Sequence, residues 1–252
     1  MKISLINFTD DALNLLLRTK NTRLSNEADD PHNWSEEKKA EHLAYMLTTI
    51  KSSWEMVDYV FSIEGVTRAF THELVRHRHG SYAQQSQRVV DVRESEVIMP
   101  ATVAAHPDPK ALWEMTVEDM KEAYGDLIDG GIPTGDARGL IPTNITTSII
   151  AKFSLRSLHE MAKVRLCTRA TGEFQDVMRS MRDVVIFVHP WAKDFINVQC
   201  VAEGTCAFPR YGASECPVWF PELDREAAKD IAGARWRSIR YTANPKAKGG
   251  VT

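Results

Sequence analysis

The stretch HELVRHRHGSYAQQSQR, residues 72–88, concentrates guanidinium, imidazole, hydroxyl and amide side chains that could bind an anionic ligand. Between Arg68 and Arg93 the chain carries five arginines, two acids (Glu73 and Asp91) and no lysine. Arginine without lysine favours fixed, bidentate contacts with individual phosphates or carbonyls. The stretch therefore indicates a pocket for a phosphorylated ligand. A surface loop with solvated arginines is an alternative that the residues leave open.

A metal site is not indicated by the same residues. HELVRH is one residue longer than the zinc motif H-E-x-x-H, and its histidines, His72 and His77, point to different sides of a helix. The four cysteines, Cys167, Cys200, Cys206 and Cys216, have no C-x-x-C spacing and are expected to be reduced, buried thiols. We predict that the chain binds no metal.

Covalent catalysis by a serine or cysteine is not indicated either. Ser81 and Ser86 have histidine neighbours, but no acid is placed to complete a Ser-His-Asp relay, and no cysteine lies in the stretch. Ser86 is expected to make a hydrogen bond to a ligand.

Nucleic-acid binding is the second hypothesis. The formal net charge of -3 argues against a protein that coats nucleic acid, because such proteins usually carry a global basic excess. The basic residues after Asp230, including Arg235 and Lys248, form a tail that we predict to be partly disordered. We expect one domain over residues 1–225 and this tail over 226–252. No apolar stretch is long enough to cross a membrane.

The elements that must position the arginines can be read from periodicity. Residues 1–8 and 144–153 are predicted strands. A third covers 57–63, with Val57, Tyr59, Phe61 and Ile63 on one face, and Glu64-Gly65 is expected to end it. Residues 88–90 are predicted to form a short strand, and residues 130–142 a loop.

Helices are predicted over 35–50, up to Arg76, over 109–129, over 154–166 and over 173–188. Ser35 and Ser154 are the expected N-caps. The first helix should bury Leu43, Leu47 and Ile50; the 109–129 helix should bury the stripe Trp113, Val117, Met120, Tyr124, Leu127 and Ile128. Strands and helices do not alternate strictly. The chain is thus predicted to have an α+β fold, a mixed or antiparallel sheet flanked by long helices.

The segment RHRHGSYAQQSQR, residues 76–88, resembles the motif of the flavin-dependent thymidylate synthases, R-H-R followed by a spaced S…S-x-R. The upstream segment SSWEMVDYVFSIEGVTRAFTHELVRHR and the downstream segment ARGLIPTNITTSIIAKFSLRSLHEMAKVRL are also similar to that family. The resemblance covers about residues 45–190. It implies reductive methylation of dUMP to dTMP with methylenetetrahydrofolate as one-carbon donor, FAD as electron carrier and NADPH as reductant. It also implies a homotetramer with shared active sites and an α+β fold. From the reduced cysteines we expect a cytoplasmic protein, and we expect neither a membrane nor a nucleic-acid partner.

The resemblance implies two sets of ligand contacts. The residues matching dUMP contacts are Glu73, Arg76, Gln84, Ser86, Gln87, Arg88, Arg138 and Arg165, of which Arg165 matches the catalytic arginine that polarises the uracil. The residues matching FAD contacts are Ser52, Arg76, His77, Arg78, Gln84, Ser154, Arg156 and Glu160. The chain departs from the family's usual residues at Met56, Val89, Ser154 and Glu160.

The residues themselves support a ligand at Arg165. Leu158, Met161 and Arg165 share a helical face, and a guanidinium on an apolar stripe requires an anion or carbonyl partner. Arg156 has a simpler alternative, an exposed i, i+4 pair with Glu160. A flavin protein of the same fold that has lost activity is the third hypothesis.

Overall fold

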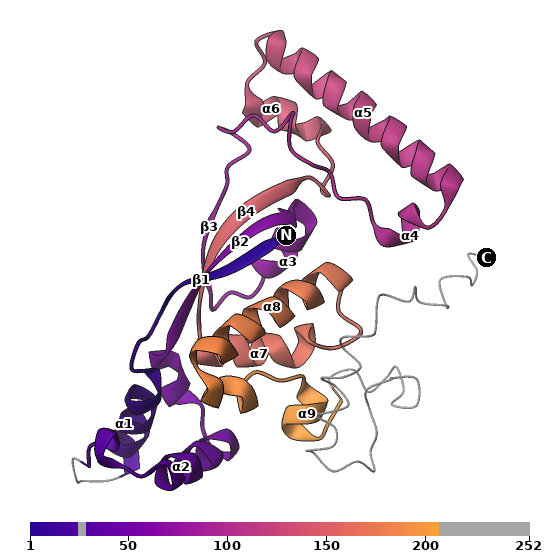
Figure 1. Cartoon of the computed structure of the whole chain (residues 1–252). Helices are drawn as coiled ribbons and strands as arrows, with labels where there is room; N and C mark the ends of the chain where they lie inside the picture. Colours follow the sequence, from indigo (N-terminus) through magenta and orange to yellow (C-terminus); the bar gives the residue numbers. More distant parts are fainter. Residues whose placement is uncertain (25–28, 207–252) are drawn as a thin grey trace.

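A computed structural model describes residues 1–24 and 29–206, which fold around a four-stranded antiparallel sheet (Figure 1). The strand order is β1-β2-β4-β3, with β1 at Lys2–Phe8, β2 at Asp58–Thr67, β3 at Ser81–Gln84 and β4 at Thr146–Ser154. The α+β prediction and three of the predicted strands are confirmed. The boundary at residue 225, the tail 226–252 and Cys216 lie outside the described residues.

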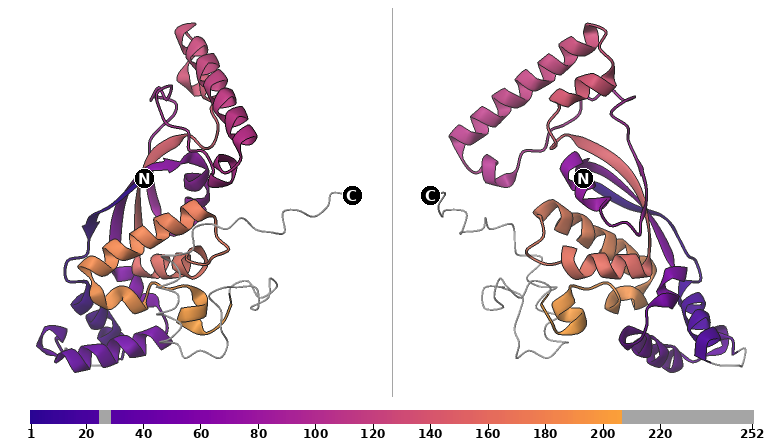
Figure 2. Two further views of the ribbon diagram at one scale, coloured as in Figure 1. Left: turned by 45° about the vertical axis from the view of Figure 1, so that its right-hand side comes forward. Right: turned by 180° about the vertical axis from the view of Figure 1, so that it is seen from behind.

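The central strand β2 has the predicted alternation, because Val57, Tyr59, Phe61 and Ile63 are all fully buried. Their face of the sheet is covered by α7 (Leu155–Arg165) and α8 (Gly172–Val188), as both views in Figure 2 show. The predicted end of the strand at Glu64-Gly65 is wrong. Gly65 adopts a φ of 66° and forms a bulge, so pairing with β4 continues to Thr67.

The predicted strand at residues 88–90 is also wrong. Pairing forms instead over Ser81–Gln84, which lies beside Ile149–Lys152 of β4. The amides of Val89 and Val90 donate to the Ser86 carbonyl, and these bonds fold the segment into a turn. The motif therefore begins in the turn before β3, follows the sheet edge over Ser81–Gln84 and leaves it after Gln85, whose amide still donates to the Ser148 carbonyl.

The helix before the motif, α3 (Arg68–Leu74), is shorter than predicted. Thr67 caps its first turn by accepting a hydrogen bond from the Phe70 amide. The amides of Arg76 and His77 bond to the carbonyls of Glu73 and Leu74 in a tighter turn, so the helix ends at Leu74 and not at Arg76.

The N-terminal helices α1 (Ala12–Leu24) and α2 (Glu36–Thr48) pack together at one end of the molecule (Figure 1). Ser35 caps α2 as predicted, accepting from the Lys38 amide, and Leu43 and Leu47 pack against the core. Ile50 lies beyond the end of α2 and is exposed, against prediction. The sequence interpretation had not assigned α1. Short elements complete this half: η1 (Pro31–Asn33), η2 (Ser52–Met56), η4 (Pro190–Asp194) and α9 (Gln199–Glu203).

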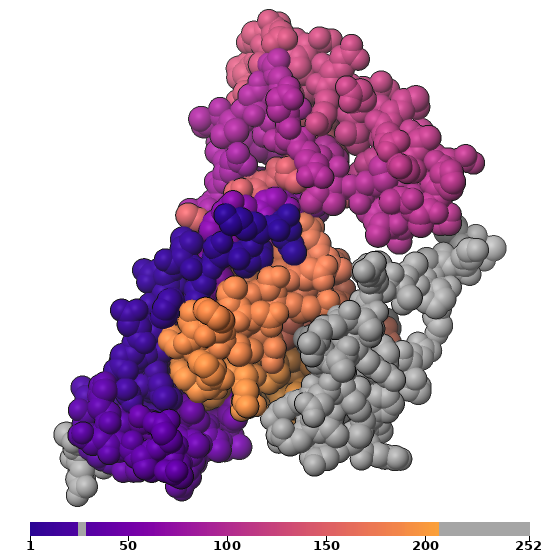
Figure 3. Space-filling view, viewed as in Figure 1, coloured from indigo at the N-terminus to yellow at the C-terminus, as the bar shows by residue number. Residues whose placement is uncertain are grey.

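Residues 101–140 form an arm that extends from the end of the sheet away from α7 and α8 (Figure 3). It contains α4 (Ala101–Ala104), the long α5 (Pro107–Asp129), α6 (Thr134–Ala137) and η3 (Arg138–Leu140), so the segment predicted as a loop holds two short helical turns. The α5 helix was predicted correctly, but only Tyr124 of its apolar stripe is buried. In residues 1–24 and 29–206, no helix combines the length and the apolar character needed to span a membrane.

Candidate active site

The R-H-R segment is a sharp turn between α3 and β3 that Tyr82 holds in place. The Tyr82 hydroxyl lies 2.6 Å from the His77 carbonyl oxygen and 3.1 Å from that of Leu74. Gly80 has no room for a side chain, because a Cβ there would lie 2.6 Å from both Phe153 Cε1 and the Tyr82 hydroxyl. The turn is therefore held in place by its contacts with Tyr82 and Phe153. It leaves the neighbouring Arg76 and Arg78 exposed.

Arg165, at the end of α7, meets three side chains. Its Nη1 donates to Glu73 Oε2 at 3.0 Å, and its Nε donates to His77 Nε2 at 3.3 Å. Its Cζ lies 4.3 Å from the centroid of the Phe174 ring. The structure thus brings together three predicted site residues, Glu73, His77 and Arg165, from segments far apart in the sequence.

His77 serves in this cluster as a neutral acceptor. Burial and, after it, the adjacent Arg165 guanidinium lower the pKa of His77 from 6.5 to about 4. Because Nε2 accepts the hydrogen bond, the neutral ring carries its proton on Nδ1. His77 thus adds no positive charge at neutral pH, and the charge of the R-H-R turn comes from its two arginines.

The last residue of β3 contacts α3, and the polar loop that follows contacts the arm. Gln84 Nε2 donates to Thr71 Oγ1 on α3 at 2.7 Å. Ser86 Oγ accepts from the Arg88 amide at 3.2 Å, and Thr134 of α6 donates to the Arg88 carbonyl at 2.5 Å. The backbone of this loop is ordered by these bonds. The side chains of Arg88 and Gln87 make no hydrogen bond with any residue in the described ranges.

Arg68 and Arg138 form a pair of half-buried like charges near this loop. Arg68 Nη1 donates to the Gln85 carbonyl at 3.4 Å. Burial lowers the pKa of Arg68, and the neighbouring Arg138 guanidinium lowers it further. Neither arginine forms an ion pair with a carboxylate in the part of the chain that the structure describes. Two half-buried cations without an acid are an arrangement that an anion would stabilise.

Two predicted FAD residues, Ser154 and Arg156, meet Glu55 at the start of α7. Ser154 Oγ caps the helix, accepting from the Ser157 amide, and donates to Glu55 Oε2 at 2.7 Å. Arg156 lies 3.3 Å from Glu55 Oε1, so the alternative pair between Arg156 and Glu160 is wrong. The Ser157 hydroxyl donates to the His79 carbonyl at 3.1 Å, which joins this group to the R-H-R turn.

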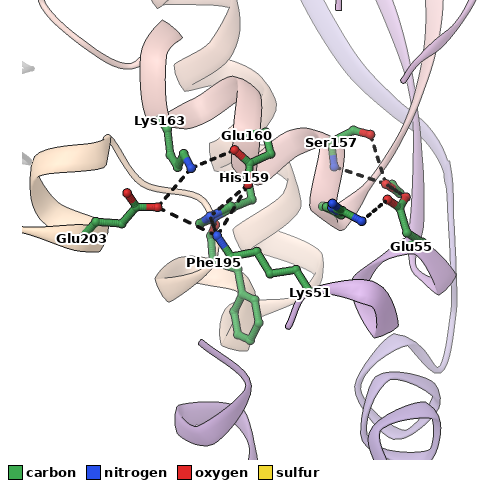
Figure 4. A network of polar contacts seen from close by, with 10 residues as sticks. Lys51, Glu55, Ser157, His159, Glu160, Lys163, Phe195 and Glu203 are labelled. Atoms are coloured by element: carbon green, nitrogen blue, oxygen red, sulfur yellow. Dashed lines mark hydrogen bonds and ion pairs between the residues drawn. The ribbon is translucent and has the colours of Figure 1, made fainter. Parts of the chain in front are cut away.

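Glu160, another predicted FAD residue, belongs to a network of charges (Figure 4). It lies 2.8 Å from Lys163 and 3.5 Å from Lys51. The buried His159 receives a hydrogen bond from Lys51 and donates to the Phe195 carbonyl at 2.7 Å, and burial lowers its pKa. Ser52 lies apart from this network and accepts a hydrogen bond from Arg23. Glu160 and Ser52 are therefore not brought to the Arg165 cluster.

The comparisons with known proteins agree on one family. The family model described as thymidylate synthase complementing protein matches residues 4–191, beginning earlier than the resemblance predicted from the motifs. The chain belongs to this family. Its curated relatives named flavin-dependent thymidylate synthase include a protein of Nitratidesulfovibrio vulgaris, 38% identical over 172 residues, which are 62% of this chain and 70% of the relative. A protein of that name from Pyrococcus furiosus is 33% identical over 166 residues, 62% of this chain and 67% of the relative.

The Geobacter sulfurreducens protein of the same name is 36% identical over 142 residues, 56% of this chain and 61% of the relative. The family predicted from the motifs is confirmed.

Three residues of the site were missed by sequence reasoning. Arg68 was counted among the arginines but given no role. The strand before it was predicted to end at Glu64-Gly65, so the sequence did not mark Arg68 as the residue that directly follows β2. Tyr82 and Phe174 were given no role, and nothing in their sequence neighbourhoods relates them to His77 or Arg165. No group of three or more His, Cys, Asp or Glu side chains suited to a metal ion is found within residues 1–24 and 29–206.

Proposed function

We propose that this protein is a flavin-dependent thymidylate synthase that converts dUMP to dTMP. The observation that supports this most directly is the set of guanidiniums that lack a carboxylate partner. Arg76 and Arg78 of the R-H-R turn, and Arg68 and Arg138 near the loop after β3, form no ion pair with a carboxylate in the described ranges. Arg165 contacts the turn through His77. Such a donor set suits phosphorylated ligands, of which the proposed reaction uses several.

The proposed reaction is a reductive methylation at C5 of the uracil ring. The methylene carbon of methylenetetrahydrofolate bonds to C5, the C5 proton is released, and a hydride equivalent from NADPH completes the methyl group. The two carbon–nitrogen bonds of the folate break, and its nitrogens take up protons. FAD, when bound, would carry the hydride equivalent from NADPH to the one-carbon unit. The chain itself has to bind, orient and stabilise charge.

Arg165 is the proposed catalytic residue. Its guanidinium would stabilise the negative charge that develops on the uracil. The proposed dUMP contacts are Glu73, Arg76, Gln84, Ser86, Gln87, Arg88, Arg138 and Arg165. We add Arg68, because its neighbour Arg138 is one of the predicted dUMP contacts. The proposed FAD contacts are Ser52, Arg76, His77, Arg78, Gln84, Ser154, Arg156 and Glu160.

A homotetramer with shared sites is also proposed. Leu112 and Met115 on α5 are 60% and 58% exposed, and Ile6 and Ile150 are exposed on the sheet. Apolar side chains gathered on a projecting arm are typical of a surface that another copy of the chain covers. The comparisons give no support to the nucleic-acid alternative. The cytoplasmic location stays a prediction.

Two measurements test the proposal. The purified protein, supplied with FAD, should show a flavin absorption band at about 450 nm. It should release tritium from dUMP labelled at C5 when methylenetetrahydrofolate and NADPH are present. A protein that takes up no FAD would contradict the proposal, and flavin uptake without tritium release would favour the inactive flavin protein.

The catalytic role proposed for Arg165 is tested by a variant at that position. Arg165→Ala should abolish most turnover, whereas Arg18→Ala, which removes an exposed arginine paired with Asp30, should not. Full turnover and unchanged dUMP affinity in Arg165→Ala would show that the catalytic assignment is wrong.

A further inference from the structure

Phe174 is a buried ring in the first turn of α8 that touches the proposed catalytic arginine. Its side chain is fully buried, and its ring centroid lies 4.3 Å from Arg165 Cζ. The ring is itself held edge-on by Phe70 at 4.9 Å and by His77 at 5.8 Å. Phe174 therefore has a fixed position from which it can constrain Arg165.

The three contacts of Arg165 constrain different motions of the guanidinium. The bonds from Nη1 to Glu73 and from Nε to His77 lie along its edges and fix where those edges point. They do not prevent the plane from tilting about the line between them. A ring against the guanidinium supplies the missing restraint through dispersion and cation–π attraction. Nη2 makes no hydrogen bond with any described residue and stays available for a ligand.

We propose that Phe174 is a positioning residue that sets the tilt of the Arg165 guanidinium toward the bound pyrimidine. The inference rests on the proposed function. Phe174 acts through Arg165 and does not touch the substrate. The simpler alternative is that Phe174 only fills the core between α3 and α8. The two accounts differ in whether the effect of Phe174 on dUMP depends on Arg165.

The test uses Phe174→Leu, which keeps an apolar side chain but removes the ring. Its matched control is Phe61→Leu, the same change at a fully buried ring in β2 whose ring contact is Phe153. Titration calorimetry of dUMP into the FAD-loaded protein should show an affinity about five- to thirtyfold lower for Phe174→Leu. Phe61→Leu should bind dUMP as the unchanged protein does.

The deciding comparison repeats Phe174→Leu in the Arg165→Ala background. If Phe174 acts through Arg165, the second change should cause no further loss of dUMP affinity. An equal loss in both backgrounds, or the same loss in Phe61→Leu, would overturn the proposal. Phe174→Met, which fills the space with a flexible apolar chain, gives the same reading if the leucine variant does not fold.

The pH dependence of binding gives a readout that a purely structural role would not change. A misplaced Arg165 should stabilise negative charge on the uracil less. The change in dUMP affinity that accompanies deprotonation of the uracil should therefore shift to higher pH in Phe174→Leu. Unchanged pH dependence would count against the proposal.

Unfolding of the unchanged protein, the two single variants and the double variant, all without ligand, tests the contact independently. Phe174→Leu and Arg165→Ala should be non-additive there, even if the unchanged protein binds neither FAD nor dUMP. If the unchanged protein binds neither FAD nor dUMP, the proposed function is wrong. If the unfolding effects of the two changes are additive, the inferred contact between Phe174 and Arg165 is wrong.

Discussion

The ion pair between Glu73 and Arg165 determines how much positive charge the site presents to a ligand. The atoms Oε2 and Nη1 are 3.0 Å apart, and the side chains are 32% and 24% exposed. Unit charges about 4 Å apart attract by about 4 kcal/mol when the effective dielectric constant is about 20. Solvent screening at this exposure reduces the net value to about 1–2 kcal/mol.

Glu73→Gln removes this charge and keeps the size of the side chain and a carbonyl acceptor for Nη1. Without its counterion, Arg165 should stabilise an anionic ligand better by a similar amount. Because one pH unit corresponds to about 1.4 kcal/mol, the ionisation of bound dUMP should move about one unit toward lower pH. The unliganded protein should lose about 1–2 kcal/mol of stability, since a half-buried guanidinium is left without an acid.

Calorimetric titration of dUMP into the FAD-loaded protein across neutral and alkaline pH measures the first effect, and urea unfolding measures the second. Glu36→Gln, at a carboxylate that pairs with Lys39 and is itself 82% exposed, is the matched control and should leave both unchanged. If Glu73→Gln binds dUMP with the pH dependence of the unchanged protein, the charge of Glu73 does not act on the ligand. The electrostatic reasoning would then be refuted.

Four further predictions follow from other contacts. Because the pKa of His77 falls from 6.5 to about 4 on folding, its contribution to stability is complete above pH 6.5 and is lost as the pH falls toward 4. Urea unfolding should therefore show a drop over that range that is about 1–2 kcal/mol smaller in His77→Gln, after discounting for partial exposure. Tyr82→Phe should cost about 1 kcal/mol of stability and raise the KM for dUMP, because the R-H-R turn loses its anchoring hydroxyl. Arg68→Ala should weaken dUMP binding about tenfold or more by calorimetry but leave deoxyuridine binding unchanged, because only dUMP carries the phosphate. Leu112→Glu combined with Met115→Glu should lower the oligomeric state seen by analytical ultracentrifugation, and an unchanged mass would exclude this face of α5 from the interface.

The sequence was sufficient for features that depend on local periodicity. The alternation in β2 and the capped starts of α2 and α7 were correct because both patterns act within a few residues. The two strand errors have one cause. Residues 88–90 are rich in β-branched side chains, but strand formation depends on the partner, and β4 pairs with the more polar Ser81–Gln84. The bulge at Gly65 likewise exists only in relation to β4.

Contacts between distant segments could not be predicted. The apolar stripe of α7 showed that Arg165 needed a partner, but Glu73 lies 92 residues away. The same limit applies to Arg156, which pairs with Glu55 and not with its helical neighbour. On α5, periodicity identified the helix but could not show what covers its apolar stripe, most of which stays accessible in the single chain.

Helix α7 fixes a spacing between the two proposed groups of ligand contacts. It runs from Leu155 to Arg165, so its ends are about 15 Å apart at 1.5 Å per residue. Ser154 and Arg156 are tied to Glu55 at one end, and Arg165 is held by Glu73 at the other. A single aromatic ring of a ligand is too short to contact both ends of α7. An insertion of a single residue would turn Arg165 by about 100° relative to Ser154. The length of this helix is therefore as much a requirement of the site as the identity of its residues.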